Sequence, residues 1–95
     1  LRGLPSDEVR PDRVADAPVS FECRLTQLVQ LRDQHGTGVD AWLSLGEVVA
    51  VHIDEDLLVD GVYDTARAEP VLRGGGPSAY FAVTADQRFD LVRPA

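Results

Sequence analysis

The stretch that decides the fold is Pro18-Val-Ser-Phe-Glu-Cys-Arg-Leu25, together with Gly46-Glu-Val-Val-Ala-Val-His-Ile-Asp54 further along the chain. Between Val19 and Leu31, apolar side chains recur at every second residue. This period of two predicts a long antiparallel strand with one buried face and one face in solvent. The members of the apolar face are Val19, Phe21, Cys23, Leu25, Val29 and Leu31.

A second strand is predicted from Ala41 to Ile53, after a turn at 33–40 whose glycines can adopt a positive φ. Its apolar side chains occupy both faces, and such a strand is normally covered on both. We therefore expect it to lie centrally in a barrel or under a second subunit. Gly46, in its middle, predicts a bulge or the close approach of another group. Without a cover the strand would expose a large apolar patch, made of Trp42, Leu43, Leu45 and Val48.

The remaining segments are short. Residues 1–17 are polar and aperiodic, and we interpret them as a lead-in arm. One helical turn ended by glycine is predicted at 54–61, and a second turn at 64–68. The pattern at 87–93 predicts a last short strand. We therefore expect one small, mainly β unit over residues 18–95, preceded by the arm.

Composition narrows the functional classes. The chain has 95 residues and a net charge of −7, and its nine basic residues are all arginine. Such an acidic chain argues against nucleic acid as a partner, because binding phosphates needs clustered cations. No segment approaches the roughly 18 consecutive apolar residues of a membrane span, so no membrane is expected. The single cysteine excludes an internal disulfide and is typical of a reducing compartment, which favours the cytoplasm.

Taken in order, the segments resemble the C-terminal half of the flavin reductase-like, FMN-binding split-barrel family. The resemblance implies a mainly β fold, in which antiparallel strands and short helical turns form part of an FMN-binding split β-barrel. Because the chain has no methionine and begins at Leu1, we expect it to be the C-terminal part of a larger protein. The residues that carry the resemblance are Pro11, Arg13 and Val14, then Pro18 to Leu25, Gly46-Glu-Val with Val51-His-Ile-Asp54, Asp60-Gly61, Pro70-Val71, Arg73 with the glycines after it, Tyr80, and Phe89 to Pro94.

The resemblance also implies a function. Members of this family are homodimers that bind FMN, and in some cases FAD, in a groove at the subunit interface. Many pass a hydride from NADH or NADPH to the flavin, and the reduced flavin then serves a monooxygenase. The family's main phosphate- and isoalloxazine-binding segments lie in the N-terminal half, which this sequence does not contain. The alternative is therefore a non-catalytic dimerisation or assembly module without bound flavin.

Five residues are the candidates for contact with a cofactor: Arg73, Gly74, Gly75, Tyr80 and His52. A guanidinium beside exposed glycine amides suits a phosphate, and an aromatic ring can cover a flavin. The family has a hydrophobic residue and two glycines after the arginine, whereas three glycines and a proline follow directly in this chain. A plain flexible turn and aromatic core packing are the alternative roles for the loop and for Tyr80.

The remaining polar residues have two interpretations. His52 either contacts the nicotinamide or reduced flavin, or is a hydrogen-bonded histidine at the rim of a barrel. Glu22 and Glu47 lie on successive predicted strands, and we expect them to face each other or an arginine such as Arg24 as structural groups. Cys23 is expected on the inward face as a small hydrophobe. No catalytic residue is assigned, and two scattered histidines with one cysteine predict no metal site.

Overall fold

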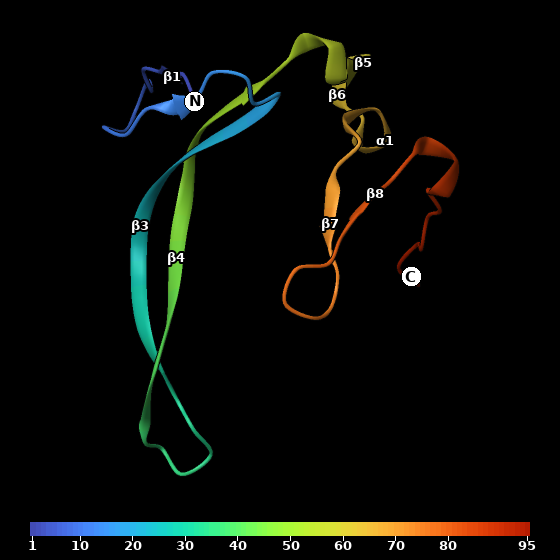
Figure 1. Ribbon diagram of the computed structural model, residues 1–95. Helices are drawn as coiled ribbons and strands as arrows, with labels where there is room; N and C mark the ends of the chain where they lie inside the picture. Colours follow the sequence, from blue (N-terminus) through green and yellow to red (C-terminus); the bar gives the residue numbers. More distant parts are fainter. The chain divides into compact units, whose positions relative to one another are not determined.

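The computed structural model describes residues 1–95, which divide into two compact units, Leu1–Ile53 and Asp54–Ala95. The predicted mainly β fold with antiparallel strands and short helical turns is confirmed, as Figure 1 shows. The strands form four separate two-stranded sheets, β1–β2, β3–β4, β5–β6 and β7–β8, and no closed barrel. None of the helices is long and apolar enough to cross a membrane.

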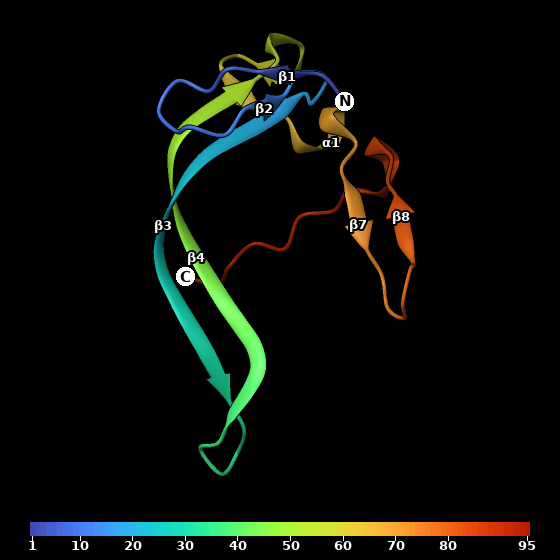
Figure 2. The same cartoon turned by 60° about the vertical axis from the view of Figure 1, so that its left-hand side comes forward.

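The dominant element of the first unit is the hairpin of β3 (Val19–Arg32) and β4 (Gly38–Ile53), seen from two sides in Figures 1 and 2. Both predicted strands are confirmed, and each extends further toward the turn than the sequence pattern indicated. The turn is tight because the Asp33 carboxylate accepts the N–H groups of His35 and Thr37, at 2.8 and 3.0 Å. Gly36 completes it with a φ of 81°, a value that glycine adopts without steric cost.

Bulges interrupt the pairing of β3 with β4. Leu25 lies opposite Gly46 while Gln27 lies opposite Leu45, so Thr26 is an extra residue on β3. The predicted bulge at Gly46 is therefore confirmed, although the extra residue belongs to the facing strand. Further register shifts occur between Glu22 and Cys23 and between Gln30 and Arg32. Since a bulge breaks the alternation of side chains, the single continuous apolar face predicted for this strand is wrong.

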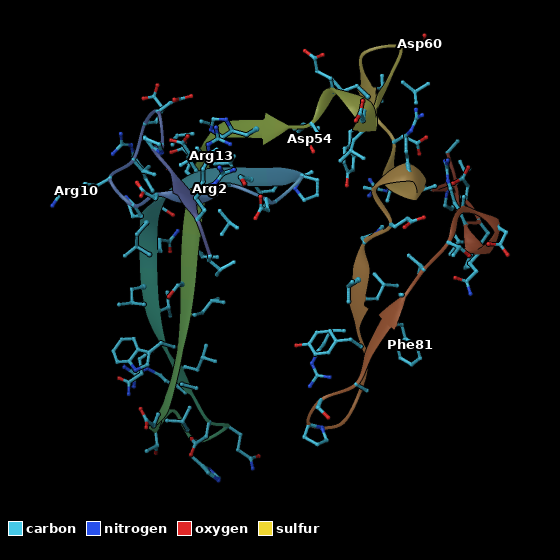
Figure 3. All side chains as sticks on the ribbon, turned by 45° about the horizontal axis from the view of Figure 1, so that its top comes forward. Arg2, Arg10, Arg13, Asp54, Asp60 and Phe81 are labelled. Carbon is cyan, nitrogen blue, oxygen red and sulfur yellow. The ribbon has the colours of Figure 1, made fainter.

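The hairpin buries almost none of its apolar side chains. Leu57, in the second unit, is the one buried hydrophobic residue of the chain. The predicted exposed patch is present, and side chains stand off both faces of β3–β4 in Figure 3. The predicted inward face is also in solvent, with Phe21 61% exposed and Cys23 exposed, because the small sheet formed by the arm leaves these side chains uncovered. Apart from the part that the arm covers at Glu22, both faces of this hairpin are thus open for a further layer.

The first unit also contains β1 (Gly3–Leu4) and β2 (Arg13–Val14), which pair with each other in the predicted arm. The chain between them, residues 5–12, has no regular structure and comes close to the start of β3. The arm is therefore not a free tail, since its backbone bonds to two side chains of the hairpin: Glu22, described below, and Arg24, whose Nη2 donates to the carbonyl oxygen of Glu8.

The second unit begins with η1 (Glu55–Leu57), which is shorter than the predicted helical turn. The chain then forms β5 (Leu58–Val59) and β6 (Val62–Tyr63), a small hairpin turned at Asp60 and Gly61, both with positive φ. The predicted second turn is confirmed as α1 (Thr65–Ala68). Its first amides are satisfied by the carboxylate of Asp64, which accepts from Ala66 N at 3.1 Å.

The end of the chain contains β7 (Val71–Arg73) and β8 (Tyr80–Ala82), a second hairpin, followed by η2 (Ala85–Gln87). The last strand predicted at 87–93 is wrong. Its first residue belongs to η2, and residues 88–95 have no regular structure. An apolar run becomes a strand only where a neighbour accepts its backbone hydrogen bonds, and no such neighbour lies beside this run.

The turn of the long hairpin provides a test of the fold. Gly36→Ala should destabilise the hairpin by about 1 kcal/mol, because an alanine at this positive φ crowds its own backbone. Gly46→Ala is the matched control, since its Cβ would meet Cys23 Cβ at an ordinary 3.4 Å. Urea denaturation followed by the fluorescence of Trp42, the single tryptophan, measures both. Equal stabilities would show that the turn at Gly36 does not limit the hairpin.

Candidate functional site

The most deeply buried side chain of the protein is a carboxylate, Glu22 on β3, which is 2% exposed. Its Oε1 accepts the backbone N–H groups of Glu8 and Val9, at 2.6 and 3.3 Å. Its Oε2 accepts the N–H of Asp7 at 2.9 Å and lies 2.5 Å from Nε2 of His52. Glu22 was expected to face Glu47 or an arginine on the solvent-facing side, and this prediction is wrong because Glu22 is buried against the arm and His52. Glu47 does lie opposite an arginine, Arg24, as expected.

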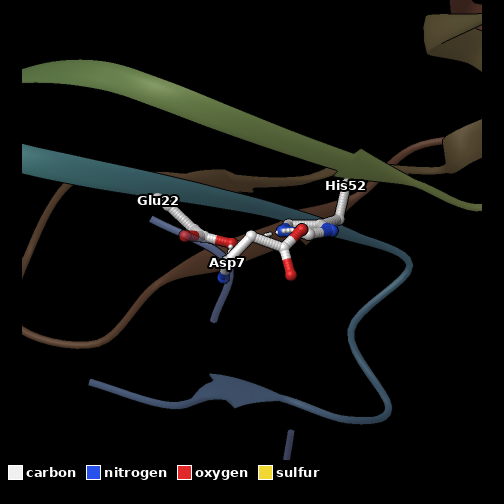
Figure 4. A group of neighbouring side chains, drawn as sticks. All are labelled: Asp7, Glu22 and His52. Atoms are coloured by element: carbon white, nitrogen blue, oxygen red, sulfur yellow. Dashed lines mark hydrogen bonds and ion pairs between the residues drawn. The ribbon is translucent and has the colours of Figure 1, made fainter. Parts of the chain in front are cut away.

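Strand register brings Glu22 and His52 together. His52 on β4 lies opposite Ser20, and Glu22 lies opposite Ala50, so the two side chains are diagonal neighbours on one face of the hairpin. Asp7 comes from the arm, and its Oδ2 is 3.9 Å from Nε2 of His52. Figure 4 shows the three side chains directed toward one another. The arm and the two strands therefore meet at this cluster.

The hydrogen bonds hold Glu22 in its ionised form. The backbone N–H of Asp7 has the largest effect, and burial acts against it by disfavouring the charge. The N–H of Glu8, the His52 ring and the N–H of Val9 add to the first effect, and together they lower the pKa of Glu22 from 4.5 to about 2. At neutral pH this carboxylate is consequently charged and can only accept hydrogen bonds.

The same three side chains are of types that ligate divalent cations, and their ligand atoms all lie within 4.8 Å of one another. A carboxylate, however, has about four lone-pair positions, and the four contacts already described occupy those of Glu22. A cation would have to enter between Nε2 of His52 and Oε2 of Glu22, now 2.5 Å apart. The geometry is that of a close hydrogen bond between the carboxylate and the imidazole, and it does not fit a preformed metal site.

The second candidate site is the loop between β7 and β8. Arg73 turns its guanidinium into this loop, where Nη1 donates to the carbonyl oxygens of Gly74 and Ala79 and Nη2 donates to that of Gly76. The guanidinium carbon also lies 5.1 Å from the centre of the Tyr80 ring. Arg73 thus organises the loop by gathering its carbonyl groups.

The loop leaves donors free. The amides of Gly75, Gly76 and Ser78 make no hydrogen bond within the protein. At Gly74 a side chain would crowd the loop, because a Cβ there would lie 2.6 Å from Cε2 of Phe81. Tyr80 is 63% exposed, so its alternative role in core packing does not apply within this chain.

Four of the five predicted cofactor contacts therefore lie together in the β7–β8 hairpin, namely Arg73, Gly74, Gly75 and Tyr80. His52 belongs to the other unit, where it is hydrogen-bonded to Glu22, as its structural interpretation predicted, although the strand that carries it belongs to a two-stranded sheet and not to a closed barrel. A groove of about 670 Å³ in the second unit is lined by other residues, among them Tyr63, Arg88 and Phe89. None of the five predicted contacts lines that groove.

No protein-family model matches the chain. No solved structure matches it either.

The Glu22 cluster predicts how the stability of the first unit depends on pH. The folded pKa of Glu22, about 2, lies below the unfolded value of 4.5, so its contribution is complete above pH 4.5 and is lost as the pH falls toward 2. Glu22→Gln should remove this contribution, leaving a flatter profile across that window. Urea denaturation at a series of pH values, followed by Trp42 fluorescence, measures the difference.

Glu47→Gln is the matched control, because Glu47 is an exposed carboxylate on the same hairpin, opposite Arg24, and does not contact the amides of residues 7–9. It should keep the acid dependence of the unaltered protein. An unchanged profile in Glu22→Gln would mean that the carboxylate does not hold the arm.

Proposed function

We propose that this chain is the C-terminal part of a flavin reductase-like protein, in which it completes an FMN-binding split β-barrel at a homodimer interface. In this proposal the protein transfers a hydride from NADH or NADPH to the flavin. A flavin-dependent monooxygenase would then use the reduced flavin. The flavin supplies the redox chemistry, and the share of this chain is to bind and orient the two nucleotides.

The observation that carries the proposal is the Arg73 loop. Free amides at Gly75, Gly76 and Ser78 stand next to a guanidinium, and this combination of donors suits an anionic group such as a phosphate. The exposed ring of Tyr80 adds an aromatic surface beside the same loop. Arg73 would act chiefly by keeping the loop open for the ligand, since its own donors already hold three loop carbonyls.

The length, bulges and exposed apolar faces of the long hairpin are the arguments for the proposed barrel and the proposed dimer. Strands of 14 and 16 residues with several bulges are suited to bending around a closed sheet. Both faces carry exposed apolar side chains, including Trp42 at 55% and Leu25 at 66%. A patch of this kind on a monomer normally marks an interface. We assign its cover to the rest of the barrel and to a second subunit.

The second candidate function is a non-catalytic assembly module without bound flavin. The same exposed hairpin favours it, because an interface needs the apolar faces and no cofactor. The engagement of Arg73 with its own loop also fits this role, since a guanidinium that holds carbonyl groups has fewer donors for a ligand. The two functions differ in whether flavin binds.

Flavin binding tests the proposal. The purified full-length protein should bind FMN, with a visible flavin absorbance and a quenched flavin fluorescence. Arg73→Ala should weaken FMN binding roughly tenfold or more, because charge-assisted hydrogen bonds that shape the loop are lost. Arg67→Ala is the control, since this exposed arginine of α1 makes no side-chain hydrogen bond.

A colourless protein that does not bind added FMN would overturn the flavin proposal and favour the assembly module. FMN binding that is equally strong in Arg73→Ala would instead remove the β7–β8 loop from the site.

A further inference from the structure

The Glu22 cluster has a chemical consequence beyond holding the arm. Oε1 accepts two backbone N–H groups and Oε2 accepts one, and because these bonds keep the carboxylate ionised, the remaining lone pair of Oε2 faces Nε2 of His52 as an acceptor. The close contact between Oε2 and Nε2 of His52 therefore requires the hydrogen to reside on the ring nitrogen. Asp7 lies on the same side, with Oδ2 3.9 Å from Nε2, and adds a second negative charge facing that nitrogen.

The other ring nitrogen of His52 is free. Nδ1 makes no hydrogen bond in the protein. Among the side-chain nitrogen and oxygen atoms that are buried, Nε of Arg13 is the one without a hydrogen-bond partner. Because Nδ1 of His52 also has no partner, it must be accessible to solvent. A neutral imidazole carries one hydrogen, and with that hydrogen on Nε2 the lone pair is on Nδ1.

We propose that Glu22 is a positioning residue that fixes His52 in the Nε2–H form and makes Nδ1 a proton-accepting site for an N–H or O–H group of a ligand. The histidine is oriented by a buried carboxylate in the way that many functional imidazoles are. The choice of ligand rests on the proposed function, which requires a nicotinamide nucleotide, and the carboxamide of a nicotinamide carries such an N–H group. Upon protonation, Nδ1 becomes a donor and suits an anionic group instead.

The first experiment concerns the ring alone and needs no cofactor. Long-range ¹H–¹⁵N NMR spectra of the protein at alkaline pH should show His52 with a protonated Nε2 and an unprotonated Nδ1. Glu22→Gln should reverse the pattern, because the glutamine amide would donate to Nε2 while its oxygen keeps the N–H groups of Glu8 and Val9. Glu47→Gln should leave the spectrum unchanged. An Nδ1–H form in the unaltered protein would overturn the proposal.

The second experiment concerns the ligand and uses free nicotinamide as the probe. Adding it should move the Nδ1 resonance of His52 in the unaltered protein and leave it in place in Glu22→Gln. A separate titration with FMN reports on the proposed function. If FMN binds while nicotinamide leaves Nδ1 unmoved, the ligand assignment is overturned and the flavin proposal stands. If FMN fails to bind, the flavin proposal falls, whereas the Nε2–H form remains decided by the first experiment.

Discussion

The carboxylate of Glu22 connects three parts of the first unit through four hydrogen-bond donors. It sits on β3, takes three backbone N–H groups from residues 7–9 of the arm, and pairs with His52 near the end of β4. A buried charge is tolerated only where such partners satisfy it. The arm, the register of the hairpin at this end and the orientation of the imidazole therefore all depend on this ionised side chain, and Arg24 adds one further bond to the arm at the carbonyl oxygen of Glu8.

Apolar packing contributes little in comparison. Leu57 is the one buried hydrophobic residue, and the long hairpin exposes apolar side chains on both faces. A two-stranded hairpin alone is marginally stable in water, so its backbone ladder needs further support. The Glu22 cluster supplies that support at one end, and the Asp33 turn with Gly36 supplies it at the other. Between them, the open apolar faces are what the proposed barrel and dimer would cover.

The sequence pattern predicted those features that depend on residues close in the chain. Period-two alternation located both long strands, and Gly46 located the bulge, because these signals are local. The role of Glu22 could not be predicted in the same way. Its main partners are backbone amides of the arm, and a backbone amide has no residue type by which a pattern could identify it. Asp7 was missed for the same reason, since only the placement of the arm brings it near His52.

The candidate site in the β7–β8 loop was likewise predictable from the sequence only in part. The glycines after Arg73 predicted a loop with exposed amides, and the amides of Gly75 and Gly76 make no hydrogen bond within the protein. The sequence could not indicate that the guanidinium turns back onto Gly74, Gly76 and Ala79, because this geometry depends on how the loop closes. Whether a strand forms near the C-terminus depended likewise on a neighbouring strand, which the segment at 88–95 lacks.

The most direct test of this account is a ¹³C NMR titration of the Glu22 side-chain carboxyl group in the folded protein. The account predicts a midpoint near pH 2, well below the ordinary value of 4.5, with the amide resonances of Asp7, Glu8 and Val9 changing in the same transition. A midpoint near 4.5, with those amides unaffected, would contradict it, because the carboxylate would then be an ordinary surface group and the arm would be held by something else.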